Sequence, residues 1–276
     1  MSELGYEKIK HEGCVFNKRK DGTQCTVALH VDDLLITSVS APLIDELCER
    51  LRMKYREVSR SDGPVANYLG MTFDLGVKGE ATVTMKGYIQ DALEASGTTG
   101  LAASPAIDQP FDVRDIARVG EEERAKFHSM VAKLLYLAKR TKPECLTAVS
   151  FLAPRVTKCT ADDVGKLARL VRYIRRTKDR GIVLRPGLLG ICVRVFVNAA
   201  FGVHNDFRSH TGSCIVIGDT GAVHCRSCKQ TSANKPSTEA ELMAASDSAN
   251  QGLYLRHFLI DQGHDTGPVT IYQDNT

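Results

Sequence analysis

Hydrophobic and polar positions divide the chain into three stretches with different spacing. Up to about residue 85, short apolar runs alternate with turn residues, which predicts short strands around one helix. Between residues 121 and 179, apolar residues recur every three or four positions, which predicts three successive helices. Strict alternation begins at residue 191, so that Val193, Val195 and Val197 share one strand face. Strands and helices in this order favour an α+β fold.

The N-terminal stretch predicts two hairpins with a helix between them. Ser40 is the expected N-cap of that helix, because Leu43, Leu47 and Leu51 follow it at helical spacing. The expected strands cover residues 14–16, 24–30, 34–36, 67–75 and 81–85, and a short helix is expected at 88–95.

The central stretch predicts helices at 121–140, 145–153 and 160–179. Thr160 and Asp163 form a capping-box-like start to the third helix, with Asp in place of Glu. The Gly/Ser/Ala/Pro-rich segment that ends at Pro110 is either a domain boundary or a long surface loop.

The C-terminal stretch follows a second candidate boundary at residues 187–190. Its order is strand, hairpin, helix, strand, and carboxylates lie on the helix and at the end of the last strand. The expected strands cover 191–199, 212–217, 222–227 and 269–272, and the helix covers 238–260.

Length and charge refine this picture. A chain of 276 residues, 43% of them hydrophobic, is long enough for two domains with or without an extra lobe. The net charge of +3 is unevenly distributed, because residues 140–185 contain twelve Lys and Arg but four acidic residues. Phosphate is the expected target of such a basic block.

Nine scattered cysteines without a preceding signal peptide predict free thiols in a reducing intracellular compartment, cytoplasm or nucleus. Cys225 and Cys228 form a Cys-x-x-Cys motif, but a second ligand pair at zinc-finger spacing is lacking, so no zinc site is expected. No apolar run reaches the roughly 20 residues of a membrane-spanning helix, so no membrane partner is expected.

The adjacent carboxylates of Asp32 and Asp33 stand between two apolar runs and are expected at a tight hairpin turn. Neighbouring carboxylates repel each other, and a divalent cation is the usual partner that relieves the repulsion. Mg²⁺ binds one or two carboxylates together with water and substrate phosphates, which suits nucleotidyl transfer. The alternative is an ordinary solvated Asp-Asp turn.

The sequence HVDDLLITS at residues 30–38 resembles the YVDD-type polymerase hairpin of reverse transcriptases, in particular those of copia-type LTR retrotransposons, with His30 in place of the usual Tyr. The resemblance continues, in the family's order, through EGCVFNKR, NYLGMTF, FHSMVAKLLYLAKRTKPE and STEAELMAASDSANQGLYLRHFL. It implies a partial palm at 1–100, a helical thumb and connection at 101–187, and a ribonuclease H-like mixed sheet with helices at 188–276, truncated at both ends of the chain.

The resemblance implies a second site, in which ribonuclease H chemistry uses two metal ions, Mg²⁺ or Mn²⁺, roughly 4 Å apart. The first-helix ligand falls on Glu241 and the fourth-strand ligand on Asp274, whereas the first-strand position holds Asn198 where the family has Asp. Asn offers one uncharged carbonyl oxygen, so metal binding is expected to be weakened. Thr238 and Glu241 also fit a capping box, which is the alternative reading of Glu241.

Both sites therefore look incomplete. The family's remaining polymerase Asp lies on an earlier palm strand, and only about thirty residues precede the hairpin. The last ribonuclease H helix would lie beyond Thr276. We expect neither polymerisation nor useful hybrid cleavage by this polypeptide alone, although the remainder of a polyprotein could supply missing parts.

The resemblance also gives a role to the basic face of the helix at 160–179. In the family this thumb region packs along the template–primer backbone, so sequence-independent, salt-sensitive phosphate contacts are expected. The alternative is a face that is merely solvated. The residues concerned are Lys166, Arg169, Arg172 and Arg176.

Three hypotheses follow. The chain is an enzyme fragment with metal ligands Asp32, Asp33, Glu241 and Asp274; or it is a non-catalytic remnant that binds an RNA–DNA hybrid; or it is a decayed reading frame without function. Asn198 favours inactivity, and only a folded remnant should bind hybrid with a steep salt dependence.

Overall fold

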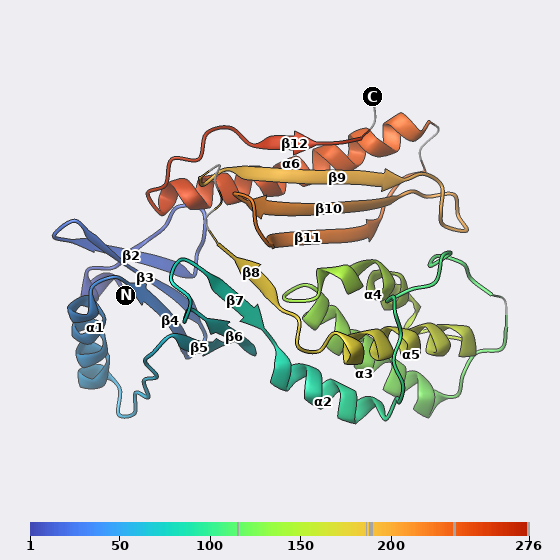
Figure 1. The fold of residues 1–276 in the computed structure, drawn as a ribbon, viewed down its shortest axis with the longest axis horizontal. Coiled ribbons are helices and arrows are strands. Elements are labelled where there is room, and N and C mark those ends of the chain that lie inside the picture. The colour runs from blue at the N-terminus through green and yellow to red at the C-terminus, as the bar shows by residue number, and fades with distance from the viewer. Residues whose placement is uncertain (115, 186, 188–189, 234–235, 275–276) are drawn as a thin grey trace.

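Three four-stranded sheets and six α-helices are formed by residues 1–114, 116–185, 187, 190–233 and 236–274, which this computed structural model describes (Figure 1). The first sheet has the strand order β1-β2-β3-β4, the second β5-β6-β7-β8 and the third β11-β10-β9-β12. Helices and largely antiparallel strands in this arrangement confirm the predicted α+β fold class.

The first sheet packs against α1, and together they enclose a small apolar core. Ser40 is the N-cap of α1, as predicted, although its side chain makes no capping hydrogen bond. The β2–β3 strands are longer than predicted because their turn contracts to Asp21 and Gly22, which have φ angles of 51° and 74°. The elements are β1 (Glu7–Lys8), β2 (Val15–Lys20), β3 (Thr23–His30), β4 (Asp33–Ser38) and α1 (Ala41–Lys54), and the buried residues are Tyr6, Cys25, Val27, Leu43, Leu47 and Leu51.

The second sheet corrects one prediction. The single strand expected at 67–75 is a hairpin, because the chain reverses at Leu69 and Gly70, which have φ angles of 52° and 72°. The sequence pattern also gave no sign of β8, which lies far along the chain and pairs with β7. The strands are β5 (Val65–Tyr68), β6 (Met71–Asp74), β7 (Ala81–Thr84) and β8 (Ile182–Leu184).

Four helices form the largest core. The capping box of α5 is confirmed, since Thr160 Oγ1 accepts from the Asp163 N–H while the Asp163 carboxylate accepts from the Thr160 N–H. The buried Asp163 carboxylate also pairs with Arg155 at 2.5 and 2.9 Å. The helices are α2 (Lys86–Ser96), α3 (Glu121–Ala138), α4 (Leu146–Leu152) and α5 (Ala161–Arg176), with short 3-10 turns at Pro143–Cys145 and Ala153–Arg155 beside α4 and at Ser2–Leu4 near the N-terminus.

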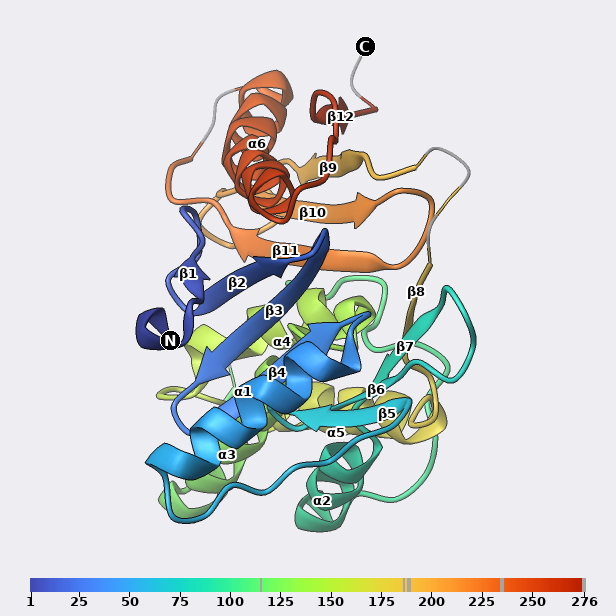
Figure 2. The same cartoon turned by 90° about the vertical axis from the view of Figure 1, so that its left-hand side faces the viewer.

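The third sheet is mixed, because β12 runs parallel to β9 whereas the other pairs are antiparallel. Its inner face packs on α6 through Val193, Val195, Ile215 and Leu259. The opposite face of the sheet contacts α4, one of the four helices of the largest core. The sheet therefore lies between α6 and α4 (Figures 1 and 2). The elements are β9 (Val193–Ala200), β10 (His210–Ile217), β11 (Ala222–Lys229), α6 (Ser237–Asp261) and β12 (Thr270–Tyr272).

The elements do not separate cleanly at residues 100 and 187. Helix α2 contributes Ile89 and Leu93 to the helical core, although it precedes residue 100. Residues 188 and 189 lie outside the described part of the chain, so the predicted boundary there is only partly covered.

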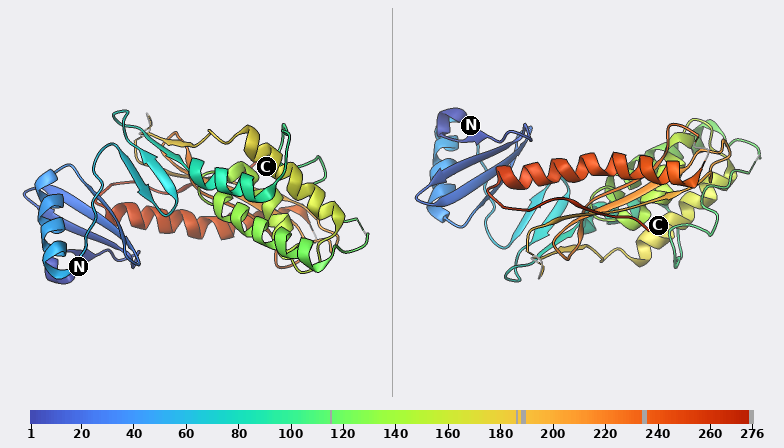
Figure 3. Two further views of the ribbon diagram at one scale, coloured as in Figure 1. Left: turned by 90° about the horizontal axis from the view of Figure 1, so that it is seen from below. Right: turned by 90° about the horizontal axis from the view of Figure 1, so that it is seen from above.

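Long-range contacts join the three regions. Thr220, in the β10–β11 turn, exchanges hydrogen bonds with the Arg185 backbone just after β8. The C-terminal end of α6 reaches the first sheet, where Asp261 accepts from the N–H and Nδ1 of His11, each at 2.9 Å. In the views from above and below, α6 runs along the length of the molecule toward the N-terminal strands (Figure 3).

Candidate functional site

The Asp32–Asp33 pair lies at the tip of the β3–β4 hairpin. His30 pairs with Asp33, so Val31 and Asp32 form the two-residue turn and Asp33 begins β4. Val31 has a φ of 53°, which is rare and strained for a β-branched residue, and it is 82% exposed. A strained, exposed tip of this kind is a candidate for function rather than for core packing.

Both carboxylates of this pair are exposed to solvent. Tyr68 of β5 lies beside the hairpin, and its hydroxyl donates to the Ala28 carbonyl at 3.4 Å. Burial, followed by the negative charge of Asp33, raises the pKa of Tyr68. The hairpin therefore presents two carboxylates outward from a rigid pair of strands.

The predicted ribonuclease H residues gather at one end of the third sheet. The rings of Phe196 and Tyr272 stack across the parallel β9–β12 pair with centroids 4.9 Å apart. Asn198 and Asp274 each follow two residues later, and both line a groove of about 740 Å³. The groove lies between the outer face of the sheet and the start of α4, including Glu144 and Thr147.

Glu241 lies on the other side of β9, on α6, and is nearly buried. Its Oε1 accepts from the Ala199 N–H at 3.0 Å, and its Oε2 accepts from Gln273 Nε2 at 2.8 Å. The alternative capping role is not borne out, because α6 begins at Ser237 after Pro236 and has no side-chain cap hydrogen bond. Glu241 instead ties α6 to the ends of β9 and β12.

These donors do not fit a pair of divalent cations. Within the described residues, no group of three or more His, Cys, Asp or Glu side chains could hold a metal ion. Asn198 brings no charge, and both oxygens of Glu241 already accept hydrogen bonds. Two-metal clamping needs several converging carboxylates, and here Asp274 and Glu144 are the carboxylates among the described residues that line the groove.

The basic face of α5 holds the segment before α3. Arg169 donates to Ser104 Oγ at 2.9 Å, and Arg172 Nε donates to the Thr99 carbonyl at 2.9 Å. Lys166 donates to the Asp112 carbonyl and pairs with Asp162 at 3.2 Å. Arg176 is exposed, and no ion pair is recorded for it among the described residues. Of the four predicted phosphate contacts, Arg176 is thus the least committed within the chain.

Two arrangements on the groove side of the sheet escaped the sequence analysis. His204, His210, Ser227 and Thr147 form a hydrogen-bonded chain with successive distances of 3.0, 2.7 and 3.1 Å. Burial, followed by the neighbouring His204, lowers the pKa of His210 to about 4. Cys214 and Cys225 lie opposite each other on β10 and β11. Alternation along β10 and β11 tells which side chains of each strand share a face. It does not tell which residue of β10 lies opposite which residue of β11, and that register is given by the structure.

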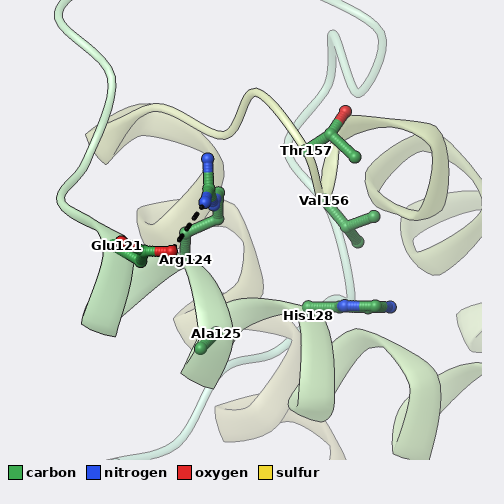
Figure 4. A pocket seen from close by; sticks show the side chains of 6 residues that line it. All are labelled: Glu121, Arg124, Ala125, His128, Val156 and Thr157. Carbon is green, nitrogen blue, oxygen red and sulfur yellow. Dashed lines mark hydrogen bonds and ion pairs between the residues drawn. The ribbon is translucent and has the colours of Figure 1, made fainter.

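A separate hollow of about 380 Å³ lies between the start of α3 and the turn after α4 (Figure 4). It contains none of the predicted site residues, and its ion pair, Glu121 with Arg124 at 3.5 Å, is largely exposed. The arrangement is typical of a solvated helix end and gives no sign of chemistry. The lining residues are Glu121, Arg124, Ala125, His128, Val156 and Thr157.

Among the helices of the described residues, none combines the length and the apolar character that crossing a membrane requires.

Sequence comparison relates the chain to mobile genetic elements. A transposon Ty5-1 protein of Saccharomyces cerevisiae is 26% identical over 255 residues, which cover 90% of this chain and 80% of that protein. The retrovirus-related Pol polyprotein from transposon RE1 of Arabidopsis thaliana is 24% identical over 99% of this chain. The corresponding polyprotein from transposon TNT 1-94 of Nicotiana tabacum is 23% identical over 100% of this chain.

The chain spans 18% of the RE1 polyprotein and 21% of the TNT 1-94 polyprotein. No protein-family model matches it. From end to end, therefore, the chain is similar to one segment of retrotransposon Pol polyproteins.

Proposed function

We propose that this chain is the part of a retroelement reverse transcriptase that runs from the palm hairpin through the thumb into ribonuclease H, and that it binds RNA–DNA hybrid without cleaving it. The observation that carries the proposal is the grouping of residues at the end of the β9–β12 pair. There the parallel pairing of β9 with β12 brings Asp274 into the same groove as Asn198, with Glu241 behind them on α6.

The donor set explains why binding would survive while cleavage would not. Mg²⁺ or Mn²⁺ would supply Lewis-acid activation of water, but a bridging carboxylate is replaced by the neutral amide of Asn198. Hybrid binding depends instead on cations that face phosphate, and Arg172 and Arg176 are exposed at the end of α5. Removing one carboxylate thus weakens the metal site and leaves the phosphate contacts intact.

Asp32 and Asp33 fit the same proposal at the other end of the chain. Two outward-facing carboxylates on a rigid hairpin are suitable ligands for a cation shared with nucleotide phosphates. The remainder of a polyprotein would complete such a polymerase centre, in line with the RE1 and TNT 1-94 relatives, in which the matched segment is one part of a longer polyprotein.

Hybrid cleavage and hybrid binding, measured side by side, test the proposal. The unaltered chain, Asn198→Asp and the double variant Asn198→Asp with Asp274→Asn are incubated with a labelled RNA–DNA hybrid and Mn²⁺, and binding is followed by fluorescence anisotropy at several salt concentrations. We expect binding by all three, with a negative slope of log affinity against log salt. We expect cleavage by none, because Asn198→Asp restores one carboxylate while both oxygens of Glu241 stay hydrogen-bonded.

Cleavage by the unaltered chain, if a single Asp274→Asn variant assayed alongside it does not cleave, would overturn the non-catalytic part of the proposal. Failure of the folded chain to bind hybrid at low salt would overturn the proposal as a whole. Circular dichroism of each variant establishes that it is folded before either result is interpreted.

A further inference from the structure

Cys214 and Cys225 face each other across the β10–β11 pair, in which β11 is the edge strand of the third sheet. They are directly opposite in the antiparallel β10–β11 register, and their sulfur atoms are 3.2 Å apart. Both side chains are half-buried and line the 740 Å³ groove, so a small reagent can reach them from solvent.

The backbone spacing of this pair suits a disulfide. Directly opposed residues of an antiparallel pair have Cα atoms about 4.5–5.5 Å apart, within the range of about 4.4–6.8 Å that disulfides require. Closing the sulfur–sulfur distance from 3.2 Å to a bond of about 2.05 Å needs side-chain rotation and no strand movement.

The neighbouring Cys228 cannot take part. Cys225 and Cys228 are three residues apart on β11, and alternation directs their side chains to opposite faces of the sheet. Cys228 accepts from Arg226 Nε at 3.1 Å, and Arg226 pairs with Asp247 of α6. The Cys-x-x-Cys motif in the sequence is therefore divided between the two faces.

We propose that Cys214 and Cys225 are a redox modification site, at which hydrogen peroxide converts the two thiols into a reversible intrachain disulfide. The Cys214 thiolate attacks one peroxide oxygen, giving a sulfenic acid and hydroxide. The Cys225 sulfur then displaces the hydroxyl group from Cys214, giving the disulfide and water. Two thiols are oxidised, and one peroxide is reduced to two waters.

The electrostatics of the pair agree with this order of attack. The hydrogen bond from Cys225, opposed by burial, lowers the pKa of Cys214 to about 7, so a large share is thiolate at neutral pH. The same contact, together with burial, raises the pKa of Cys225. Cys214 is thus the nucleophile and Cys225 the resolving thiol. Disulfide formation does not require the proposed hybrid binding, although the two cysteines line the same groove as Asn198 and Asp274.

The sequence gives a direct assay. Trypsin cleaves after Arg208 and Arg226, and the peptide between them, residues 209–226, contains Cys214 and Cys225 as its two cysteines. The folded chain is treated with peroxide, unfolded, alkylated with iodoacetamide and digested, and the peptides are weighed by mass spectrometry. We expect peptide 209–226 to lose the mass of two hydrogen atoms, to carry no alkyl group, and to recover both alkyl groups after prior treatment with dithiothreitol.

Two variants serve as controls. Cys228→Ser keeps both partners and should form the disulfide like the unaltered chain. Cys214→Ser should leave Cys225 alkylated after the same treatment. Two alkyl groups on peptide 209–226 of the folded chain, under conditions that oxidise the exposed Cys14, would overturn the proposal, and so would a link from either cysteine to Cys228 or Cys192.

Discussion

Single residues determine the chemistry that the groove can support. Asn198 provides one uncharged oxygen beside Asp274, and Glu241 is occupied by Ala199 and Gln273. Because the backbone around Asn198 is an ordinary paired strand, an Asp at the same position would add a charge without moving the fold. An Asn-to-Asp exchange at this position would therefore be a chemical change rather than a structural one.

His210 should make stability depend on pH in mildly acidic solution. Its pKa in the fold is about 4, below the ordinary 6.5, so the unfolded chain binds more protons between these values. The contribution of His210 to the free energy of unfolding is fully present above pH 6.5. It falls by about 3 kcal/mol as the pH drops to about 4. Urea unfolding across this range measures the loss, and NMR titration of the imidazole ring gives its pKa directly.

A His210→Asn variant provides the control, since it removes the titrating group. Its stability should lose the part of the slope between pH 4 and 6.5 that belongs to His210, while His204 and His224, whose pKa values burial also lowers, keep theirs. An NMR pKa of 6 or above in the unaltered chain would show that His210 is not buried as a neutral ring.

At the scale of secondary-structure elements, stability depends on the faces that pack against each other. Helix α6 approaches the third sheet closely at Gly252, where an added Cβ would lie 2.8 Å from Val195 Cγ2 and 3.0 Å from Val269 Cγ1. Val195 is fully buried and cannot move aside. Gly252 is thus a contact point and not a flexible joint.

Gly252→Ala should lower the free energy of unfolding by about 1 kcal/mol, because overpacking of about 1–3 kcal/mol exceeds the gain in helix propensity of up to about 1 kcal/mol. Gly165→Ala on α5 is the matched control. A Cβ there meets nothing within 4 Å, so this variant should be more stable by up to about 1 kcal/mol. Chemical unfolding of both variants decides the sign, and a stabilised Gly252→Ala would contradict the close approach.

On the basic face of α5, two substitutions distinguish an arginine that contacts phosphate from one that holds the segment before α3. Arg176→Ala should weaken hybrid binding and reduce the salt slope by about one, because one phosphate contact is lost. Arg169→Ala should leave the slope unchanged and speed hydrogen exchange at residues 98–112, because its guanidinium holds Ser104. Anisotropy and exchange mass spectrometry measure the two effects. Equal slopes for Arg176→Ala and the unaltered chain would remove Arg176 from the interface.

At the scale of the whole molecule, the end of α6 fastens the first sheet to the third. Besides the two hydrogen bonds from His11 to Asp261, Gln24 Nε2 donates to Gln262 Oε1 at 2.9 Å, and Tyr254 donates to Glu12 at 2.7 Å. Burial opposes ionisation of Asp261, but the hydrogen bonds from His11 outweigh it and lower the pKa of Asp261. This contribution is present above the ordinary pKa of Asp and is lost as the pH falls through the lowered value.

Asp261→Ala should weaken this junction by about 1–2 kcal/mol. We expect faster hydrogen exchange at the β2 and β3 amides, with little change in the helical core, since the two regions have separate buried clusters. Asp265→Ala, an exposed neighbour, is the control. Unchanged exchange in β2 and β3 would show that the first sheet holds its structure without α6.

The sequence by itself determined the local structure wherever a regular pattern ran long enough. The helical spacing at 121–140 and 160–179, the capping box of Thr160 with Asp163, and the alternation around Val195 predicted α3, α5 and β9 to within a few residues. These features depend on residues within a turn or two of each other, and near neighbours are what a linear pattern records.

Only the tertiary structure decided which distant residues meet. The reversal at Leu69 and Gly70, the pairing of β8 with β7, and the opposition of Cys214 to Cys225 depend on strand register. The contact of the segment before α3 with the basic face of α5, and the hydrogen-bond partners of Glu241, depend on how separate elements pack. Register and packing are set by contacts between residues far apart in the chain, and their free energies leave no periodic trace in the sequence.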